Sequence, residues 1–264
     1  MATKTRLDAE LVRRGLARSR EHARELVDAG QVRIGGIVAT KPATGVGADA
    51  SVTVAEAGAG YVSRGATKLA GALDALGGPA VAERDCLDAG ASTGGFTDVL
   101  LRRGARSVAA VDVGYGQLAW RLRTDPRVEV HERTNVRDLT PERIGRRVDL
   151  VVADLSFISL RLALPALSAV AGDDADQLLM VKPQFEAGRE AVGRGGVVRD
   201  ASVRADSVSA VAAAALALGW GTRGVVASSL PGPAGNVEYF LWLRKDAPVP
   251  DQSEIARAVA EGPS

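Results

Sequence analysis

Two lysines and two acidic residues lie beside apolar runs in an arrangement that could serve proton transfer. A lysine close to other cationic groups has its charged form disfavoured, so it can accept a proton from a weakly acidic hydroxyl. We interpret Lys182 as this base and Lys68 as the group that orients the hydroxyl. Taken singly, a charge at a strand end is usually solvated or part of a surface pair that contributes little. The four residues are Lys68 in GATKL, Asp154 in VVADLSF, Lys182 in LLMVKPQF and Glu238 in GNVEYFLW.

A glycine-rich turn, DAGASTGGF, follows the apolar run around Leu87. Backbone N–H groups at such a strand-to-helix turn can approach a polar ligand closely, because glycine has no side chain. The spacing of Gly90, Gly94 and Gly95 fails the G-x-G-x-x-G pattern of dinucleotide sites. We expect Asp112, at the end of the next strand, to accept hydrogen bonds from the ribose hydroxyls of an adenosyl ligand. Further candidates for the same ligand are Asp88, Ser92, Thr93, Asn135, Asp154 and Phe157.

From residue 65 onward, apolar strands alternate with helical segments. Repeats of strand and helix indicate an α/β fold with a doubly wound, mostly parallel sheet. The last two apolar runs, 221–230 and 236–245, are joined by a short PGPAG link, so we expect them to form an antiparallel hairpin. The other predicted strands are 85–89, 107–112, 127–131, 148–153 and 176–181, and the predicted helices are 65–76, 95–103, 116–123, 159–170 and 202–218.

The topology predicts where the charged residues meet. Doubly wound sheets bind ligands at the edge formed by the carboxyl ends of their strands. Asp154 and Lys182 each follow a predicted strand at that edge. Glu238 begins the last, antiparallel strand, so it starts from the same edge, and Lys68 lies in the first turn of a helix whose N-terminus faces it. We therefore expect all four to converge near the glycine turn.

The N-terminal part of the chain differs in charge from the rest. Residues 1–44 hold nine lysines and arginines against five acidic residues, whereas the net charge of the whole chain is +1. Helical spacing at 7–14 and 19–30, followed by a hairpin around Gly35 and Gly36, predicts a small α+β module. The uneven charge indicates a polyanion-binding appendage. Its candidate residues for contacts to such a polyanion, and the candidate RNA-binding residues under the resemblance stated below, are Lys4, Arg6, Arg14, Arg18, Arg20 and Lys41.

The composition also predicts the boundaries of the parts. The stretch EAGAGYVSRG is rich in glycine, as linkers often are. We expect a small domain over 1–57, a linker over 58–64, a large domain over 65–246 and a loosely ordered tail over 247–264.

Several other kinds of protein are disfavoured. The single cysteine, Cys86, excludes an intramolecular disulfide, and neither His22 nor His131 lies in a ligand motif, so we expect no metal. The N-terminus lacks an apolar stretch of the signal-peptide type, and no apolar run is long enough to span a membrane. We therefore expect a cytoplasmic protein with no membrane partner.

These motifs together resemble those of a known enzyme family. The sheet with its terminal hairpin is similar to the S-adenosylmethionine-dependent methyltransferase form of the Rossmann fold, and DAGASTGG is similar to motif I of those enzymes. The two lysines and two acids resemble the K-D-K-E tetrad of FtsJ-like ribose 2′-O-methyltransferases. With VSRGATKL, DVGYGQLAW, MVKPQF and LPGPAGNVEYFLWL, residues 1 to about 246 resemble the TlyA family of ribosomal RNA methyltransferases, sometimes labelled haemolysins.

The resemblance implies a function as well as a fold. It implies a Rossmann-like class I methyltransferase domain preceded by an S-four-type RNA-binding domain. It further implies S-adenosylmethionine as the cofactor and methylation of cytidine ribose in the ribosomal RNA of one or both subunits.

Three alternatives remain open at this point. Methyltransferases of exocyclic amines carry [DN]-P-P-[YF] after the fourth strand, and DLSF lacks both prolines, which disfavours amino-group methylation without excluding it. A membrane-active haemolysin is the second alternative. The third is an RNA-binding or ribosome-assembly factor whose methyltransferase half is catalytically silent.

Overall fold

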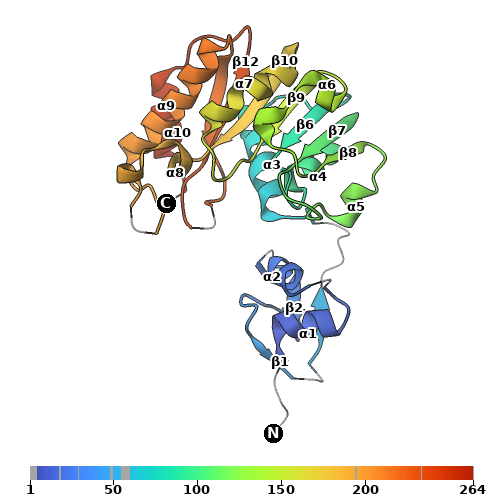
Figure 1. Ribbon diagram of the computed structural model, residues 1–264. Coiled ribbons are helices and arrows are strands. Elements are labelled where there is room, and N and C mark those ends of the chain that lie inside the picture. Colours follow the sequence, from blue (N-terminus) through green and yellow to red (C-terminus); the bar gives the residue numbers. More distant parts are fainter. Residues whose placement is uncertain are drawn as a thin grey trace. The chain divides into compact units, whose positions relative to one another are not determined.

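The computed structural model describes residues 5–17, 19–28, 30–47, 50–54, 60–193, 195–232 and 234–263, with Arg189 described by its backbone alone (Figure 1). Two of the candidate RNA-binding residues, Lys4 and Arg18, lie outside the described residues. The chain forms two compact units, Met1–Tyr61 and Val62–Ser264. The division falls within the segment that the composition predicts to be the linker.

The small unit combines two helices with short antiparallel strands. The helices α1 (Leu7–Arg13) and α2 (Arg20–Asp28) enclose a core that includes Leu7, Leu11 and Val27. As the sequence predicts, a hairpin turns at Gly35 and Gly36, whose φ angles of 56° and 83° favour glycine. The strands are β1 (Thr5–Arg6) paired with β4 (Gly45–Val46), and the sheet of β3 (Ile37–Val38), β2 (Val32–Ile34) and β5 (Val52–Val54).

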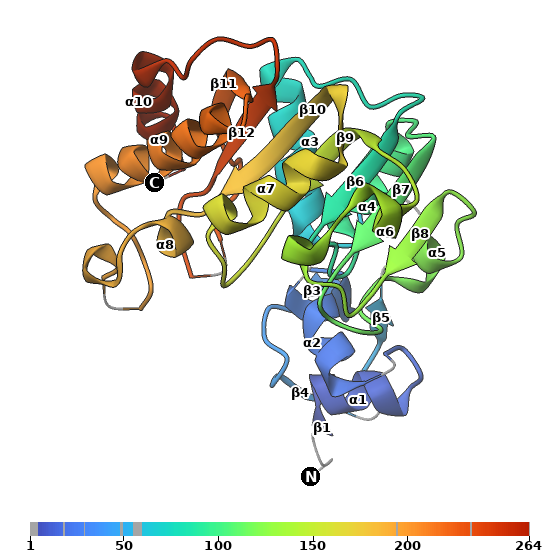
Figure 2. The same ribbon diagram turned by 45° about the horizontal axis from the view of Figure 1, so that its top comes forward.

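The large unit is built on a seven-stranded sheet with the order β11-β12-β10-β9-β6-β7-β8 (Figures 1 and 2). Five strands are parallel, and β12 runs antiparallel to both of its neighbours. The expected parallel sheet with a terminal antiparallel hairpin is therefore confirmed. The strands are β6 (Asp85–Ala89), β7 (Ser107–Val111), β8 (Val128–His131), β9 (Val148–Ala153), β10 (Ala171–Val181), β11 (Gly221–Ala227) and β12 (Tyr239–Arg244).

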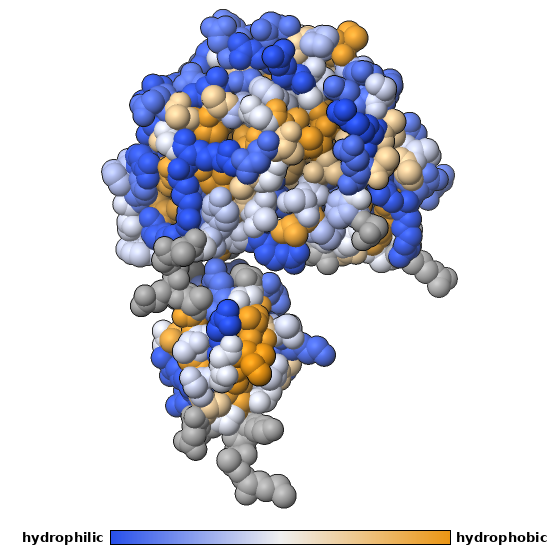
Figure 3. Space-filling view, turned by 180° about the vertical axis from the view of Figure 1, so that it is seen from behind, coloured by the Kyte–Doolittle hydropathy of each residue, from blue (hydrophilic) through white to orange (hydrophobic). Residues whose placement is uncertain are grey.

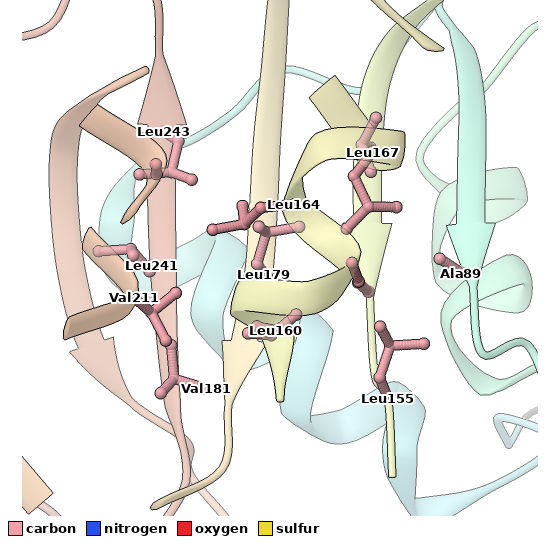
Figure 4. Packing of buried hydrophobic residues seen from close by; sticks show 14 of the residues in the cluster. Ala89, Leu155, Leu160, Leu164, Leu167, Leu179, Val181, Val211, Leu241 and Leu243 are labelled. Carbon is pink, nitrogen blue, oxygen red and sulfur yellow. The ribbon is translucent and has the colours of Figure 1, made fainter. Parts of the chain in front are cut away.

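Helices cover both faces of this sheet. On one face α3 (Arg64–Leu76) packs against α4 (Gly95–Arg102), and on the other lie α7 (Leu160–Val170) and α9 (Ala201–Ala217). Leucines of α7 are directed at the strands in Figure 4, where Leu164 lies near Leu179 of β10. Burial of these apolar side chains stabilises the layers. The short elements are α5 (Trp120–Arg123), η1 (Val136–Asp138), α6 (Pro141–Ile144), α8 (Pro183–Glu186) and η2 (Arg189–Ala191).

Two expectations about secondary structure were wrong. The tail is not loosely ordered throughout, because Gln252–Ala260 form a helix, α10, in which Ile255 and Ala258 are buried against α9 and β11. Asp251 caps this helix by accepting a hydrogen bond from the backbone N–H of Ser253. The helix expected over 116–123 begins only at Trp120, since Gly116 has a φ of 71° that a helix does not allow.

Within the described ranges, no helix combines the length and apolar character needed to cross a membrane. On the face drawn in Figure 3, hydrophobic residues are interspersed with hydrophilic ones.

Candidate active site

The sheet brings the four predicted residues to one cavity. Asp154 directly follows β9, Lys182 directly follows β10, and Glu238 directly precedes the antiparallel β12. Lys68 projects from the second turn of α3. All four line a cavity of about 310 Å³ together with residues of the glycine turn. The predicted convergence at the carboxyl edge is what the structure shows.

Each lysine in the cavity is paired with one carboxylate. Lys68 Nζ lies 2.5 Å from Glu238 Oε2, and Lys182 Nζ lies 2.5 Å from Asp154 Oδ1. Lys182 also donates a hydrogen bond of 3.0 Å to Ser156 Oγ. Both lysines are only 8% exposed, so their charges need these partners. The cavity therefore holds two neutralised ion pairs whose lysine amines are fixed in position.

The glycine turn permits close backbone approaches that any side chain would block. At Gly90, with a φ of 87°, an added Cβ would lie 2.4 Å from the backbone oxygen of Asp154. At Gly95, a Cβ would lie 2.2 Å from Ser63 Oγ. These two glycines thus hold the turn against the loop after β9 and against the start of α3. Gly94 does not contact these segments, because a Cβ added there would instead meet the side chain of Leu122. It lines neither this cavity nor the second cavity described below.

A second cavity of about 710 Å³ adjoins the first, and the two share Gly90, Ser92, Asp154 and Ser156 in their walls. Asp112 lines the second cavity, where its carboxylate accepts hydrogen bonds from the N–H groups of Ser92, at 2.8 Å, and Gly114, at 2.6 Å. Asn135 and Phe157 line it too. A ligand in both cavities would reach from Asp112 to the two lysines.

Comparison with known proteins identifies the family. A family model described as FtsJ-like methyltransferase matches residues 61–245, and one described as S4 domain matches residues 5–52. Over 100% of both chains, this chain is 61% identical to the 16S/23S rRNA (cytidine-2′-O)-methyltransferase TlyA of Mycobacterium tuberculosis. The chain belongs to the TlyA family of FtsJ-like methyltransferases.

Other relatives in the TlyA family carry a different name. Hemolysin A of Brachyspira hyodysenteriae is 35% identical, over 89% of this chain and 98% of that protein. A solved structure from Streptococcus thermophilus, also described under the name hemolysin, is 38% identical and superposes with a TM-score of 0.78, covering 99% of this chain and 96% of that one. The fold of the whole chain is therefore one already seen within the family.

Asp88 of this TlyA-family site does not lie where the motif suggested. Its side chain is fully buried and lines neither cavity. One carboxylate oxygen accepts hydrogen bonds from the backbone N–H of Thr97, at 2.8 Å, and from Thr97 Oγ1, at 2.6 Å. The motif predicts that Asp88 binds the cofactor, but its contacts instead secure the first turn of α4. Burial raises the pKa of this carboxyl to about 7, against a usual value of 3.8.

The raised pKa makes stability depend on pH. Between about pH 4 and pH 7, the folded chain retains the Asp88 proton that the unfolded chain has released, so the free energy of unfolding falls as pH rises. Asp88→Asn keeps an acceptor for Thr97 and removes the titration. The stability of this variant relative to the natural chain should grow through that window, by up to roughly 4 kcal/mol, and level off above it. Chemical denaturation at several pH values measures the difference, and a constant difference from pH 4 to 8 would contradict the assignment.

The sequence did not reveal two residues that organise the site. Gln117 lines the second cavity and accepts a hydrogen bond from Ser92 Oγ at 3.3 Å. Glu186, whose side chain is 1% exposed, accepts hydrogen bonds of 2.6 Å from Ser159 Oγ and from the backbone N–H of Leu160. It thus ties the segment after Lys182 to the loop after β9. In the sequence, Glu186 directly follows the MVKPQF motif, and this position could have indicated that it belongs to the site.

In the small unit, the predicted RNA-binding residues fall into different settings. The side chains of Arg6 and Arg20 are about half exposed and both contact the buried carboxylate of Asp8, at 3.0 and 3.1 Å. The hydrogen bond from Arg6 holds the pKa of Asp8 far below its usual range. Arg14 bonds to Glu10 at 2.6 Å and is mostly buried, whereas Lys41 is exposed. Asp8 therefore gathers Arg6 and Arg20 on one surface of this unit.

Proposed function

We propose that this chain transfers a methyl group from S-adenosylmethionine to the 2′ hydroxyl of a cytidine in ribosomal RNA. The observation that carries the proposal is the pair of lysine–carboxylate contacts in a cavity that opens into the Asp112 cavity. The M. tuberculosis relative is named for this reaction. Family membership supplies the methyltransferase class, and the residues supply a reason for hydroxyl rather than amine chemistry.

The residues present fit S-adenosylmethionine. Gly90 and Gly95 pack the turn closely against neighbouring backbone and line the first cavity, as a turn that wraps a ligand requires. Asp112, Asn135 and Phe157 line the second cavity, where Asp112 would accept hydrogen bonds from the ribose hydroxyls and the other two would border the adenine. Ser92 and Thr93 line the first cavity and would hold the amino-acid part. When bound, this cofactor supplies a methyl group carried on a positively charged sulfur.

The lysines act on the acceptor hydroxyl. In its uncharged form, Lys182 Nζ would take the proton of the 2′ hydroxyl as that oxygen bonds to the methyl carbon and the carbon–sulfur bond breaks, and Asp154 would stabilise the resulting ammonium. Lys68 donates a hydrogen bond that orients the hydroxyl oxygen, while Glu238 holds Lys68 in place. Fixed positions for both reactants contribute most of the rate increase.

The substrate is tested directly by labelling. Purified protein is incubated with methyl-labelled S-adenosylmethionine and with separated small and large ribosomal subunits, and the modified nucleotide is mapped. We expect the label on the 2′ oxygen of cytidine in the RNA of one or both subunits. Label on a base, or on ribosomal protein, would refute the proposed reaction.

The small unit should bind the phosphate backbone of the RNA. Arg6 and Arg20 present guanidinium groups from one surface, and Lys4, Arg14, Arg18 and Lys41 belong to the same basic segment. Arginines of this kind bind phosphates and make affinity depend on salt.

Loss of these arginines should weaken substrate binding selectively. Arg6→Ala and Arg20→Ala should each lower affinity for the methylated subunit and reduce the salt dependence by about one unit of slope, because one phosphate contact is lost. Cofactor affinity should stay within about twofold, measured by calorimetry. Arg13→Ala, at an exposed arginine of the same unit outside the Asp8 group, is the matched control. Equal losses of cofactor and subunit affinity would count against a dedicated RNA surface.

A further inference from the structure

Exposed aromatic side chains of the large unit lie in segments that follow strands at the carboxyl edge of the sheet. Among the described large hydrophobic residues, the exposed aromatics are Tyr115 at 68%, Trp120 at 70% and Phe157 at 92%. Tyr115 and Trp120 lie between β7 and β8, and Phe157 follows β9. Of the three, Phe157 lines the cavity that contains Asp112.

Tyr115 carries an arginine stacked over its ring. The guanidinium carbon of Arg133 lies 4.3 Å from the ring centroid, within the range of a cation–π contact. Arg133 is itself exposed, and its φ of 52° is unusual for a residue other than glycine. Strained backbone of this kind persists where surrounding structure holds it, often at functional sites. The pair therefore presents an aromatic ring and a cationic guanidinium to solvent.

Hydrogen bonds donated by backbone N–H groups connect the loop after β7 to the loop after β8. The N–H of Arg133 donates to the carbonyl of Gly114 at 3.1 Å, and the N–H of Gly116 donates to Glu132 Oε1 at 2.8 Å. Glu132 is also paired with Arg123, so its charge is offset. The loop that carries Tyr115 is thus fixed to the loop that carries Arg133 before any ligand arrives.

The charge of this surface favours an anionic partner. Among the described residues, neither Arg133 nor Arg137 makes an ion pair with a carboxylate, and both are exposed. Arg137 lines the same cavity as Asp112, and Val113, two residues before Tyr115, lines it as well. The surface therefore borders the space that we assign to the cofactor.

We propose that Tyr115 and Arg133 form a stacking platform for an unpaired base of the RNA substrate. The proposal rests on the proposed function, which requires RNA at this edge of the sheet. Single-stranded RNA is bound by aromatic rings and arginine planes on which bases stack, combined with cations that contact phosphates. Tyr115 and Arg133 supply the planes, and Arg137 supplies a further cation. A base stacked here would hold the RNA strand beside the site where its ribose reacts.

Steady-state kinetics with intact ribosomal subunits test the platform. Tyr115→Ala and Arg133→Ala should each raise KM for the subunit about tenfold, the order expected for loss of one stacked base. The rate at saturating subunit and the affinity for S-adenosylmethionine should stay within about twofold. Tyr115→Phe keeps the ring and should behave like the natural chain. Arg223→Ala is the matched control, since Arg223 is exposed near the start of β11 and therefore far from the carboxyl edge.

Crosslinking separates RNA from other partners. Tyr115 replaced by p-benzoylphenylalanine should, on irradiation of the complex, crosslink to ribosomal RNA. A crosslink to ribosomal protein, the absence of any crosslink, an unchanged KM in Tyr115→Ala, or an equal loss of cofactor affinity would each overturn the platform. If the natural chain methylates no RNA, the proposed reaction fails instead, and the crosslink still reports whether RNA lies at Tyr115.

Discussion

Lys182→Met is expected to lower the rate of methyl transfer by ~10²- to 10⁴-fold, the contribution of a positioned general base. Methionine retains most of the volume of the side chain and cannot accept the proton. Lys182 is assigned to the acceptor hydroxyl and is not among the residues that would hold the cofactor, so affinity for S-adenosylmethionine should change little. Single-turnover labelling of ribosomal RNA measures the rate, and calorimetry measures cofactor binding.

The matched control for this variant is Lys245→Met. Lys245 also forms an ion pair, with Asp173 at 2.6 Å, but its side chain is 40% exposed and lies outside both cavities. Its replacement should leave the rate of methyl transfer unchanged. A Lys182→Met protein that labels RNA at the natural rate would remove Lys182 from the role of base.

Breaking the Lys68–Glu238 pair should strongly destabilise the large unit. Glu238→Ala would leave the Lys68 ammonium only 8% exposed and without its 2.5 Å partner. Loss of one partner from such a pair costs ~3–5 kcal/mol, because an uncompensated charge stays buried. Lys68→Met removes the buried ammonium itself. In that variant, the further change Glu238→Ala should lower the free energy of unfolding much less than it does in the natural chain. The double variant should therefore be more stable than the sum of the two single effects predicts.

Chemical denaturation of the four proteins completes this double-mutant cycle. We expect a coupling free energy of roughly 1–3 kcal/mol between the two residues. The exposed pair of Arg103 and Asp74, 2.7 Å apart, gives a control cycle whose coupling should stay below about 1 kcal/mol. Additive effects at Lys68 and Glu238 would mean that the contact does not hold the site together.

The sequence was sufficient to predict the framework of the large unit. Its alternating apolar runs predicted the parallel sheet, and the short link before Asn236 predicted the antiparallel end. Because carboxyl ends of parallel strands must share an edge, Asp154 and Lys182 could be assigned to one site from the order of the strands alone. The tail helix was missed because the apolar stripe that it buries, Ile255, Ala258 and Val259, is short and is covered only when α9 and β11 pack against it.

The sequence by itself thus determined which residues reach the carboxyl edge, because strand direction follows from the order and length of the segments. Only the tertiary structure decided which lysine pairs with which carboxylate, since Lys68 and Glu238 are 170 residues apart and meet through the packing of α3 beside the sheet. It also decided that Asp88 contacts Thr97 rather than a cavity. Such contacts depend on side-chain positions within a few ångströms, which packing sets and no local pattern encodes.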